Sequence, residues 1–246
     1  MLRIGFIFIF SVLLLSAKNT VAHYSVEFGI VGEVARIDAT LSSDHTFYIL
    51  DANVSAVGSI ATTLTHNLKE RHISKGHIVN GLLVTDMYQM IKSYDNHTST
   101  TIYRVNHRKK ILTRQQKKWR GAKQIKNRTV TLGYYARDDM MTLFLNLPKH
   151  IKEKYKSKNY SFKAVGADRK NGRVDVVIPS RNALKEMRSL AGEGKTGEWY
   201  SRVVMHRRLY HSKKGEFEVR IGAEGLVEKA VLKDLIFFGD VRIIRQ

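Results

Sequence analysis

Apolar and polar residues alternate with a period of two along much of this sequence, and the fold must accommodate that pattern. Tyr24, Val26 and Phe28 alternate with polar or small residues, and the alternation resumes at Ala35. Because successive side chains of a strand point to opposite faces, this spacing predicts half-buried β-strands. We interpret residues 24–41 as strand with a bulge or bend at its central glycines, followed by a turn at 42–44.

The same reasoning predicts strands at 48–54, 71–79, 88–94, 100–105, 160–165, 173–178, 198–210, 216–221 and 226–244, with a few short helices between them. Asn171-Gly172 is a strong signal for a β-hairpin turn, and a further turn is expected at 213–215. Short helices are expected to begin at the capping residues Ser59, Asp138 and Ser180. Runs of adjacent strands favour a mainly β fold, a β-rich α+β domain built on a single curved antiparallel sheet or open barrel.

The N-terminus has the plan of a secretory signal peptide. Arg3 supplies a positive charge, residues 4–15 form an apolar run of 12 residues, and residues 20–22 are small enough for cleavage before His23. The apolar run is shorter than the roughly 20 residues that a membrane-spanning helix needs. We therefore predict a signal peptide at residues 1–22 and a single β-rich exported domain at residues 23–246, located in the periplasm.

Cysteine is absent from the sequence. An exported domain without disulfides must be stabilised by its core, and a chain of this length buries enough apolar surface for that. The absence also excludes thiolate metal ligands and a cysteine nucleophile. No metal site and no cofactor are predicted.

Positive charge dominates the composition, with a formal net charge of +20 at pH 7. No acidic residue occurs from Asn96 to Arg137, a segment that contains 12 lysines and arginines. Such a block attracts anions. Outside the cytoplasm, where nucleic acid is not expected, the candidates are lipid headgroups, lipopolysaccharide phosphates and acidic glycans, and peripheral contact with a membrane is compatible with this charge. The alternative is a basic surface that only solvent contacts.

Within this block, residues 113–120 read as an exposed loop or protruding hairpin, because the strand alternation gives way to a polar run around Trp119. The indole could insert at a membrane interface or stack on a sugar while neighbouring cations meet an anion. The predicted anion-binding residues are Arg104, Arg108, Lys109, Lys110, Arg114, Lys117, Lys118, Trp119, Arg120 and Lys123.

The order of several features resembles the exported bacterial family called domain of unknown function 3108. The features are the Tyr-x-Val opening strand at Tyr24 with Gly32-Glu33 in its middle, the strand at 48–58, the segment at 138–145, and the Trp199 strand followed by the strands at 225–244. The resemblance covers nearly all of the exported domain. It implies a Gram-negative envelope location and a β-rich, open-barrel-like fold, and it implies no established activity.

Motifs for catalysis are not convincing. The glycines at 192, 194 and 197 have dinucleotide-binding spacing, but they follow a predicted helix and precede a strand, which reverses the required context. His72 and His77 are five apart, so on one strand they face opposite ways unless the chain bends near Gly76. Asp138 and Asp139 could act as an acid and base pair, although a helix cap followed by a first-turn acid explains them more simply.

Location, charge and expected sheet curvature together favour a non-enzymatic role: binding or carrying an anionic lipid, lipopolysaccharide component or acidic glycan. The first alternative is an envelope hydrolase acting on acidic glycan or peptidoglycan, with Asp138, Asp139 and Trp199 as the residues to test. The second is a structural partner of an envelope protein assembly that docks through exposed sheet edges.

Overall fold

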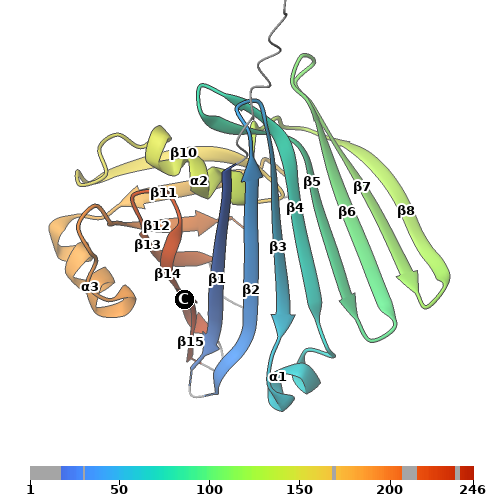
Figure 1. Ribbon diagram of the computed structural model, residues 1–246, viewed down its shortest axis with the longest axis horizontal. Coiled ribbons are helices and arrows are strands. Elements are labelled where there is room, and N and C mark those ends of the chain that lie inside the picture. Colours follow the sequence, from blue (N-terminus) through green and yellow to red (C-terminus); the bar gives the residue numbers. More distant parts are fainter. Residues whose placement is uncertain (1–17, 30, 168–169, 207–214, 236–238) are drawn as a thin grey trace, which may run out of the picture.

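The computed structural model describes residues 18–29, 31–167, 170–206, 215–235 and 239–246. These residues form one sheet of 15 strands together with three short helices (Figure 1). Neighbouring strands run antiparallel, apart from the parallel pair β9 and β10. The predicted fold class, a mainly β domain with a single open antiparallel sheet and a few short helices, is confirmed.

The chain winds through the sheet in two runs. In the first run each strand pairs with the next: β1 (Lys18–Phe28), β2 (Gly32–Ser43), β3 (Phe47–Ala56), β4 (Lys69–Val79), β5 (Leu82–Tyr94), β6 (His97–Asn106), β7 (Ile111–Arg120) and β8 (Lys123–Leu132). The second run comprises β9 (Asp138–Asp139), β10 (Lys158–Val165), β11 (Arg173–Ile178), β12 (Trp199–Met205), β13 (Glu216–Ile221), β14 (Val227–Leu235) and β15 (Gly239–Arg245). β15 pairs with β1 and so joins the two runs.

Glycine and aspartate determine where the strands turn. Gly29 and Gly32 both have positive φ and lie at the turn between β1 and β2, so the expected bulge within one strand is in fact a turn between two. The turn predicted at 42–44 is confirmed, since the Asp44 carboxylate accepts hydrogen bonds from two backbone amides of the β2–β3 connection. The Asn171-Gly172 hairpin is confirmed by the β10–β11 ladder. Of the turn predicted at 213–215, residues 213 and 214 lie outside the described residues.

The three helices are α1 (Ser59–Leu64), α2 (Met140–His150) and α3 (Arg181–Ala191). Ser180 caps α3 as expected, whereas α1 is preceded by Gly58 and has no side-chain cap. The cap of α2 is Asp139 and not Asp138, because Asp139 has the extended backbone that lets a side chain reach the first amides of the helix. Among the residues that the structure describes, no helix is both long and apolar enough to cross a membrane.

Helices α2 and α3 cover opposite faces of the curved sheet. Leu143 and Leu147 of α2 pack against Trp199 and Val219 on the inner, concave face, and these residues belong to the main core cluster. On the outer face, Met187 of α3 packs against residues such as Tyr200, which alternates with Trp199 along β12. Helix α2 is thus enclosed by the sheet, and α3 is an external cover.

The sheet curls without joining its two edges. The β9 edge returns to β5, where the Thr85 amide donates a 2.8 Å hydrogen bond to the Arg137 carbonyl and the Asp139 amide donates a 3.1 Å bond to the Thr85 hydroxyl. Strands β6, β7 and β8 therefore continue past the point of closure and splay to one side (Figure 1). We call these three strands, residues 97–132 with their turns, the flange.

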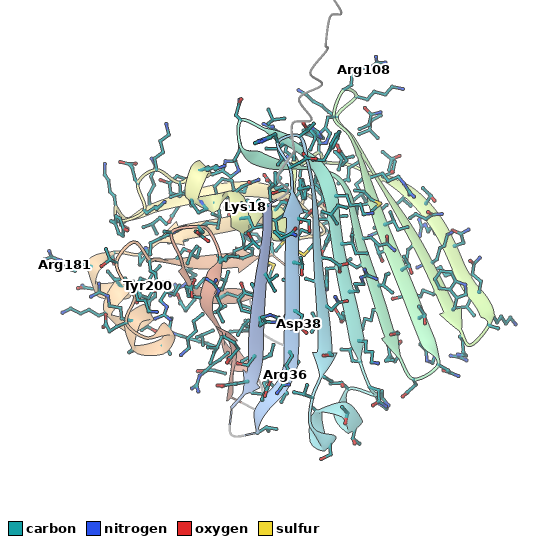
Figure 2. All side chains as sticks on the ribbon, viewed as in Figure 1. Lys18, Arg36, Asp38, Arg108, Arg181 and Tyr200 are labelled. Carbon is teal, nitrogen blue, oxygen red and sulfur yellow. The ribbon has the colours of Figure 1, made fainter. Side chains whose placement is uncertain are left out.

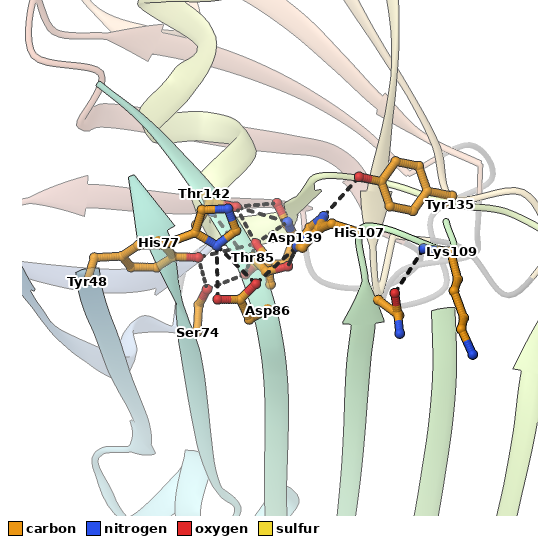
Figure 3. A network of polar contacts seen from close by, with 11 residues as sticks. Tyr48, Ser74, His77, Thr85, Asp86, His107, Lys109, Tyr135, Asp139 and Thr142 are labelled. Carbon is orange, nitrogen blue, oxygen red and sulfur yellow. Dashed lines mark hydrogen bonds and ion pairs between the residues drawn. The ribbon is translucent and has the colours of Figure 1, made fainter. Parts of the chain in front are cut away.

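A buried polar network attaches α2 to the sheet at this closure (Figure 3). The Asp139 carboxylate is fully buried and accepts hydrogen bonds from the hydroxyls of Ser74 and Thr85 and from the amides of Met141, at 2.7 Å, and Thr142, at 3.1 Å. Burial raises the pKa of Asp139, and these hydrogen bonds oppose the rise. One side chain thus both caps the helix and holds it against β4 and β5.

Replacing Asp139 with alanine is expected to lower the free energy of unfolding by about 3 kcal/mol, because the cap is lost and buried hydroxyls and amides are left without an acceptor. Urea denaturation followed by circular dichroism measures the change. Asp38→Ala is the control, since Asp38 is exposed and bonds His23 at the surface, and it should cost under about 1 kcal/mol. Equal losses in the two variants would contradict the anchoring role.

Candidate open-barrel binding site

A cavity of about 790 Å³ lies between α2 and the inner face of the sheet. Its wall is formed by residues from β1 to β5, from β12 to β15 and from α2, and most of them are apolar, including Ala39, Leu50, Ala52, Met90, Phe144 and Ala230. This volume falls within the range of roughly 300–1,000 Å³ that is usual for small-molecule pockets. The space is therefore suited to an apolar group of a ligand.

A few polar residues lie in the wall of this cavity. The Asn146 amide is committed to the fold, because it exchanges hydrogen bonds of 2.9 and 3.0 Å with the backbone of Leu83. The Lys149 ammonium donates a hydrogen bond to the Gly81 carbonyl. Lys18 at the start of β1 adds a further positive charge, and Glu224 adds a negative one. The cavity is apolar in its body and charged at a small number of points.

Strand register extends the cavity wall onto the inner face of the flange. One row of directly paired residues crosses that face from the cavity to the sheet edge: Ala52, His72, Met90, Thr101, Gln116 and Arg128. The first three line the cavity and the last three belong to the flange. Strands are spaced about 4.8 Å apart, so Arg128 lies about 15 Å from Met90 along the sheet.

The two adjacent rows change character in the same direction. They consist of Val54, Glu70, Lys92, Ser99, Lys118 and Lys126 on one side, and of Leu50, Ser74, Tyr88, Tyr103, Arg114 and Val130 on the other. Each row begins with an apolar residue at the cavity, and the flange adds Arg114, Lys118, Lys126 and Arg128 to the same face. The inner surface is thus amphiphilic, apolar under α2 and basic on the flange.

The flange divides the predicted anion-binding residues between its two faces and its turns. Arg114, Lys118 and Arg120 share the inner face, whereas Arg104, Lys117 and Trp119 alternate with them and point to the outer face. Arg108, Lys109 and Lys110 form the turn between β6 and β7, where Arg108 protrudes (Figure 2), and Lys123 begins β8. Within the described part of the chain, no ion pair engages any of these cations.

The structure decides two expectations about this segment. Residues 113–120 are not a loop; they belong to β7, which pairs with β6 and also with β8 in the hairpin that was the alternative. Trp119 does not share a face with Lys118 and Arg120, so the indole and those two cations cannot meet one ligand group from one side. The residues that sequence reasoning left out of the site, Lys126 and Arg128, are identified only once the register of β8 is known.

Glu70 is the one acidic residue in these three rows of the inner face. Hydrogen bonding by His72, followed by that of Lys92 at 2.8 Å, lowers the pKa of Glu70 from 4.5 to about 2. The carboxylate is therefore ionised at neutral pH and is partnered by Lys92, and the flange strands contribute no acidic residue to these rows.

Because its pKa is lower in the folded than in the unfolded protein, Glu70 is expected to stabilise the fold fully above about pH 5. That contribution, about 1 to 3 kcal/mol, is lost as the pH falls from 4.5 toward 2. Urea denaturation at pH 7 and at pH 3 should show a larger loss of stability with acid for the wild type than for Glu70→Gln. Parallel pH dependences for the two proteins would contradict this assignment.

The residues proposed for an envelope hydrolase do not form an accessible pair. Asp139 is buried and has four hydrogen-bond donors, and Trp199 is 1% exposed in the core. Asp138 accepts a hydrogen bond from Asn146 and lies 3.7 Å from His150. His72 and His77 point to opposite faces of β4, as their spacing predicts: His72 faces the cavity, and His77 lies beside Asp86 and His107.

The architecture defines a class of open, β-barrel-like domain with one helix enclosed by the sheet. Among solved structures, the chain is similar to the crystal structure of a beta-barrel-like protein of domain of unknown function DUF1849 from Brucella abortus, with a TM-score of 0.52 and 6% sequence identity. The match covers 94% of this chain and 96% of that one, and it shows a shared fold. No family model matches the sequence, and no curated protein does. The resemblance to domain of unknown function 3108 stays a prediction.

Proposed function

We propose that this protein is an exported, periplasmic binding protein for an anionic amphiphile, such as an envelope lipid or a lipopolysaccharide component. The observation that carries the proposal is the change from apolar to basic residues along single rows of the inner face. An acyl group would occupy the cavity beneath α2, and its phosphate or carboxylate would meet Arg114, Lys118 and Arg128. Apolar burial supplies affinity, and the cations supply selectivity for a negative headgroup.

The same surface favours a lipid-like ligand over an acidic glycan. A glycan would use the cations, but it would gain nothing from an apolar cavity of about 790 Å³. Docking to an envelope protein has a separate basis, since β8 is at the edge of the sheet and exposes its backbone on one side within the described residues. That docking remains an alternative role for the flange.

A fluorescent medium-chain fatty acid should bind the purified protein in the cavity, and lysophosphatidylglycerol should displace it better than neutral lysophosphatidylcholine does. Neutralising Arg114, Lys118 and Arg128 to glutamine should weaken binding of the anionic lipid at least about 10-fold, because the headgroup loses its counterions. The matched control replaces Arg104, Arg108 and Lys117 with glutamine, which removes the same charge from the outer face and the turn. Fluorescence titration at two salt concentrations measures the affinity of each variant for the anionic lipid.

A second pair of variants tests the cavity itself. Ala52→Trp fills it and should abolish fatty acid binding, whereas Ile49→Trp lies on the outer face, where Ile49 is 46% exposed, and should bind normally. If the inner-face and outer-face charge variants lose the same affinity for the anionic lipid, the basic block attracts it only through its total charge. Absence of binding to the wild type would overturn the proposal.

The mature N-terminus bears on the same cavity. Residues 18–22, which the sequence analysis places in the signal peptide, pair with β2 and contribute Lys18, Thr20 and Ala22 to the cavity wall. We therefore expect export to leave these residues in place, with cleavage near Lys18. Intact mass measurement of the protein secreted to the periplasm would locate the first residue. A mature chain that begins at His23 would contradict this expectation and would shorten β1.

A further inference from the structure

Two histidines and an aspartate converge on the side of β4 that faces away from the cavity (Figure 3). They are His77 near the end of β4, Asp86 on β5 and His107 in the turn after β6. Ile78 lines the cavity, and strand alternation directs the neighbouring His77 to the opposite face. The cluster is therefore separate from the proposed ligand site.

A β-bulge brings Asp86 into this cluster. Lys75 pairs with Met87 and Gly76 pairs with Thr85, so that Asp86 is an extra residue on β5 with no partner across the ladder. A bulge of this kind redirects a side chain that regular alternation would send elsewhere. Gly76 makes the close approach of the strands feasible, because a Cβ there would collide with the Val84 carbonyl.

The three side chains present their donor atoms at distances suited to a metal ion. His77 Nδ1 is 3.0 Å from both Asp86 carboxylate oxygens, and His107 Nε2 is 3.1 Å from Asp86 Oδ1. All three donor atoms lie within 4.8 Å of one another. Metal–ligand bonds of about 2.0–2.2 Å in tetrahedral geometry separate ligand atoms by about 3.4 Å, so small side-chain rotations would complete the arrangement.

A second layer of contacts orients His107. Its Nδ1 lies 2.9 Å from the Tyr135 hydroxyl, and its Nε2 lies 3.0 Å from the Thr85 carbonyl oxygen. If Nδ1 carries the proton and donates a hydrogen bond to the Tyr135 hydroxyl, then the Nε2 lone pair is available to a metal, as is usual for ligating histidines. The Thr85 carbonyl provides a further oxygen beside the site. Metal binding would replace the Nε2 proton that otherwise donates to this carbonyl.

Access to the cluster is open. The side chains of His77, Asp86 and His107 are 32%, 45% and 23% exposed, respectively, so an ion can enter and retain water. We propose that His77, Asp86 and His107 form a binding site for a divalent transition-metal ion of zinc type, with at least one position left for water. Two imidazoles and one carboxylate are ligands that zinc prefers.

Titration of zinc into the metal-free purified protein, in competition with a chromophoric chelator, tests this site. One saturable equivalent is expected, and His77→Ala and His107→Ala should each weaken it at least 10-fold. Tyr135→Phe should weaken it about 10-fold, since it removes only the orienting hydroxyl. The control is His45→Ala, an exposed histidine outside the cluster, which should bind as the wild type does.

Circular dichroism of each variant verifies that it is folded, and zinc should raise the thermal midpoint of the wild type but not that of His107→Ala. The proposal is overturned if the wild type shows no saturable equivalent, or if His77→Ala and His107→Ala bind zinc as tightly as the wild type. Loss of binding in His45→Ala equal to that in His107→Ala would also overturn it. These outcomes do not depend on whether the cavity binds an amphiphile.

Discussion

The Asp139 carboxylate holds the molecule at the point where its sheet closes. It caps α2 and simultaneously accepts hydrogen bonds from β4 and β5, two strands that lie more than fifty residues earlier in the chain. Because the carboxylate is buried, each of its bonds is strengthened by the low dielectric, and losing any partner leaves a costly unpaired group. The position of α2 over the inner face, and therefore the existence of a cavity beneath it, depends on this network.

Closure at β5 has a second effect, because it leaves the flange outside the barrel-like body. No other part of the chain that the structure describes forms a layer over most of the flange, and its edge strand β8 is largely exposed. Lysine and arginine along β8 protect such an edge from pairing with other chains, so its charge has a role in the fold itself, apart from the proposed ligand. The same three strands thus combine a charged surface with protection of an open edge. Leu112, buried on the inner face, packs the flange against the rest of the domain.

Much of the strand content was predictable, because period-two alternation persists wherever one face of a strand is buried. Strand β7 was expected only as one of two alternatives and β8 was not expected, since apolar residues are sparse beyond Leu112: Arg114, Gln116 and Lys118 occupy the inner face of β7, where apolar residues normally mark a strand. The division of the basic block into two faces depends on register, which no local pattern encodes. The grouping of His77 with His107 depends in addition on the bulge at Asp86, so sequence spacing could not show it.

Every described strand of this sheet pairs with a neighbour in sequence, and the one pairing between distant strands is that of β1 with β15, more than two hundred residues apart. The other hairpins can form from local contacts, whereas the β1–β15 ladder closes the longest loop in the chain and carries its largest entropic cost. Completion of the sheet must therefore wait for the C-terminal strand. Because synthesis proceeds from the N-terminus, β1 is the first of these strands to be made and one of the last to acquire its full set of hydrogen bonds.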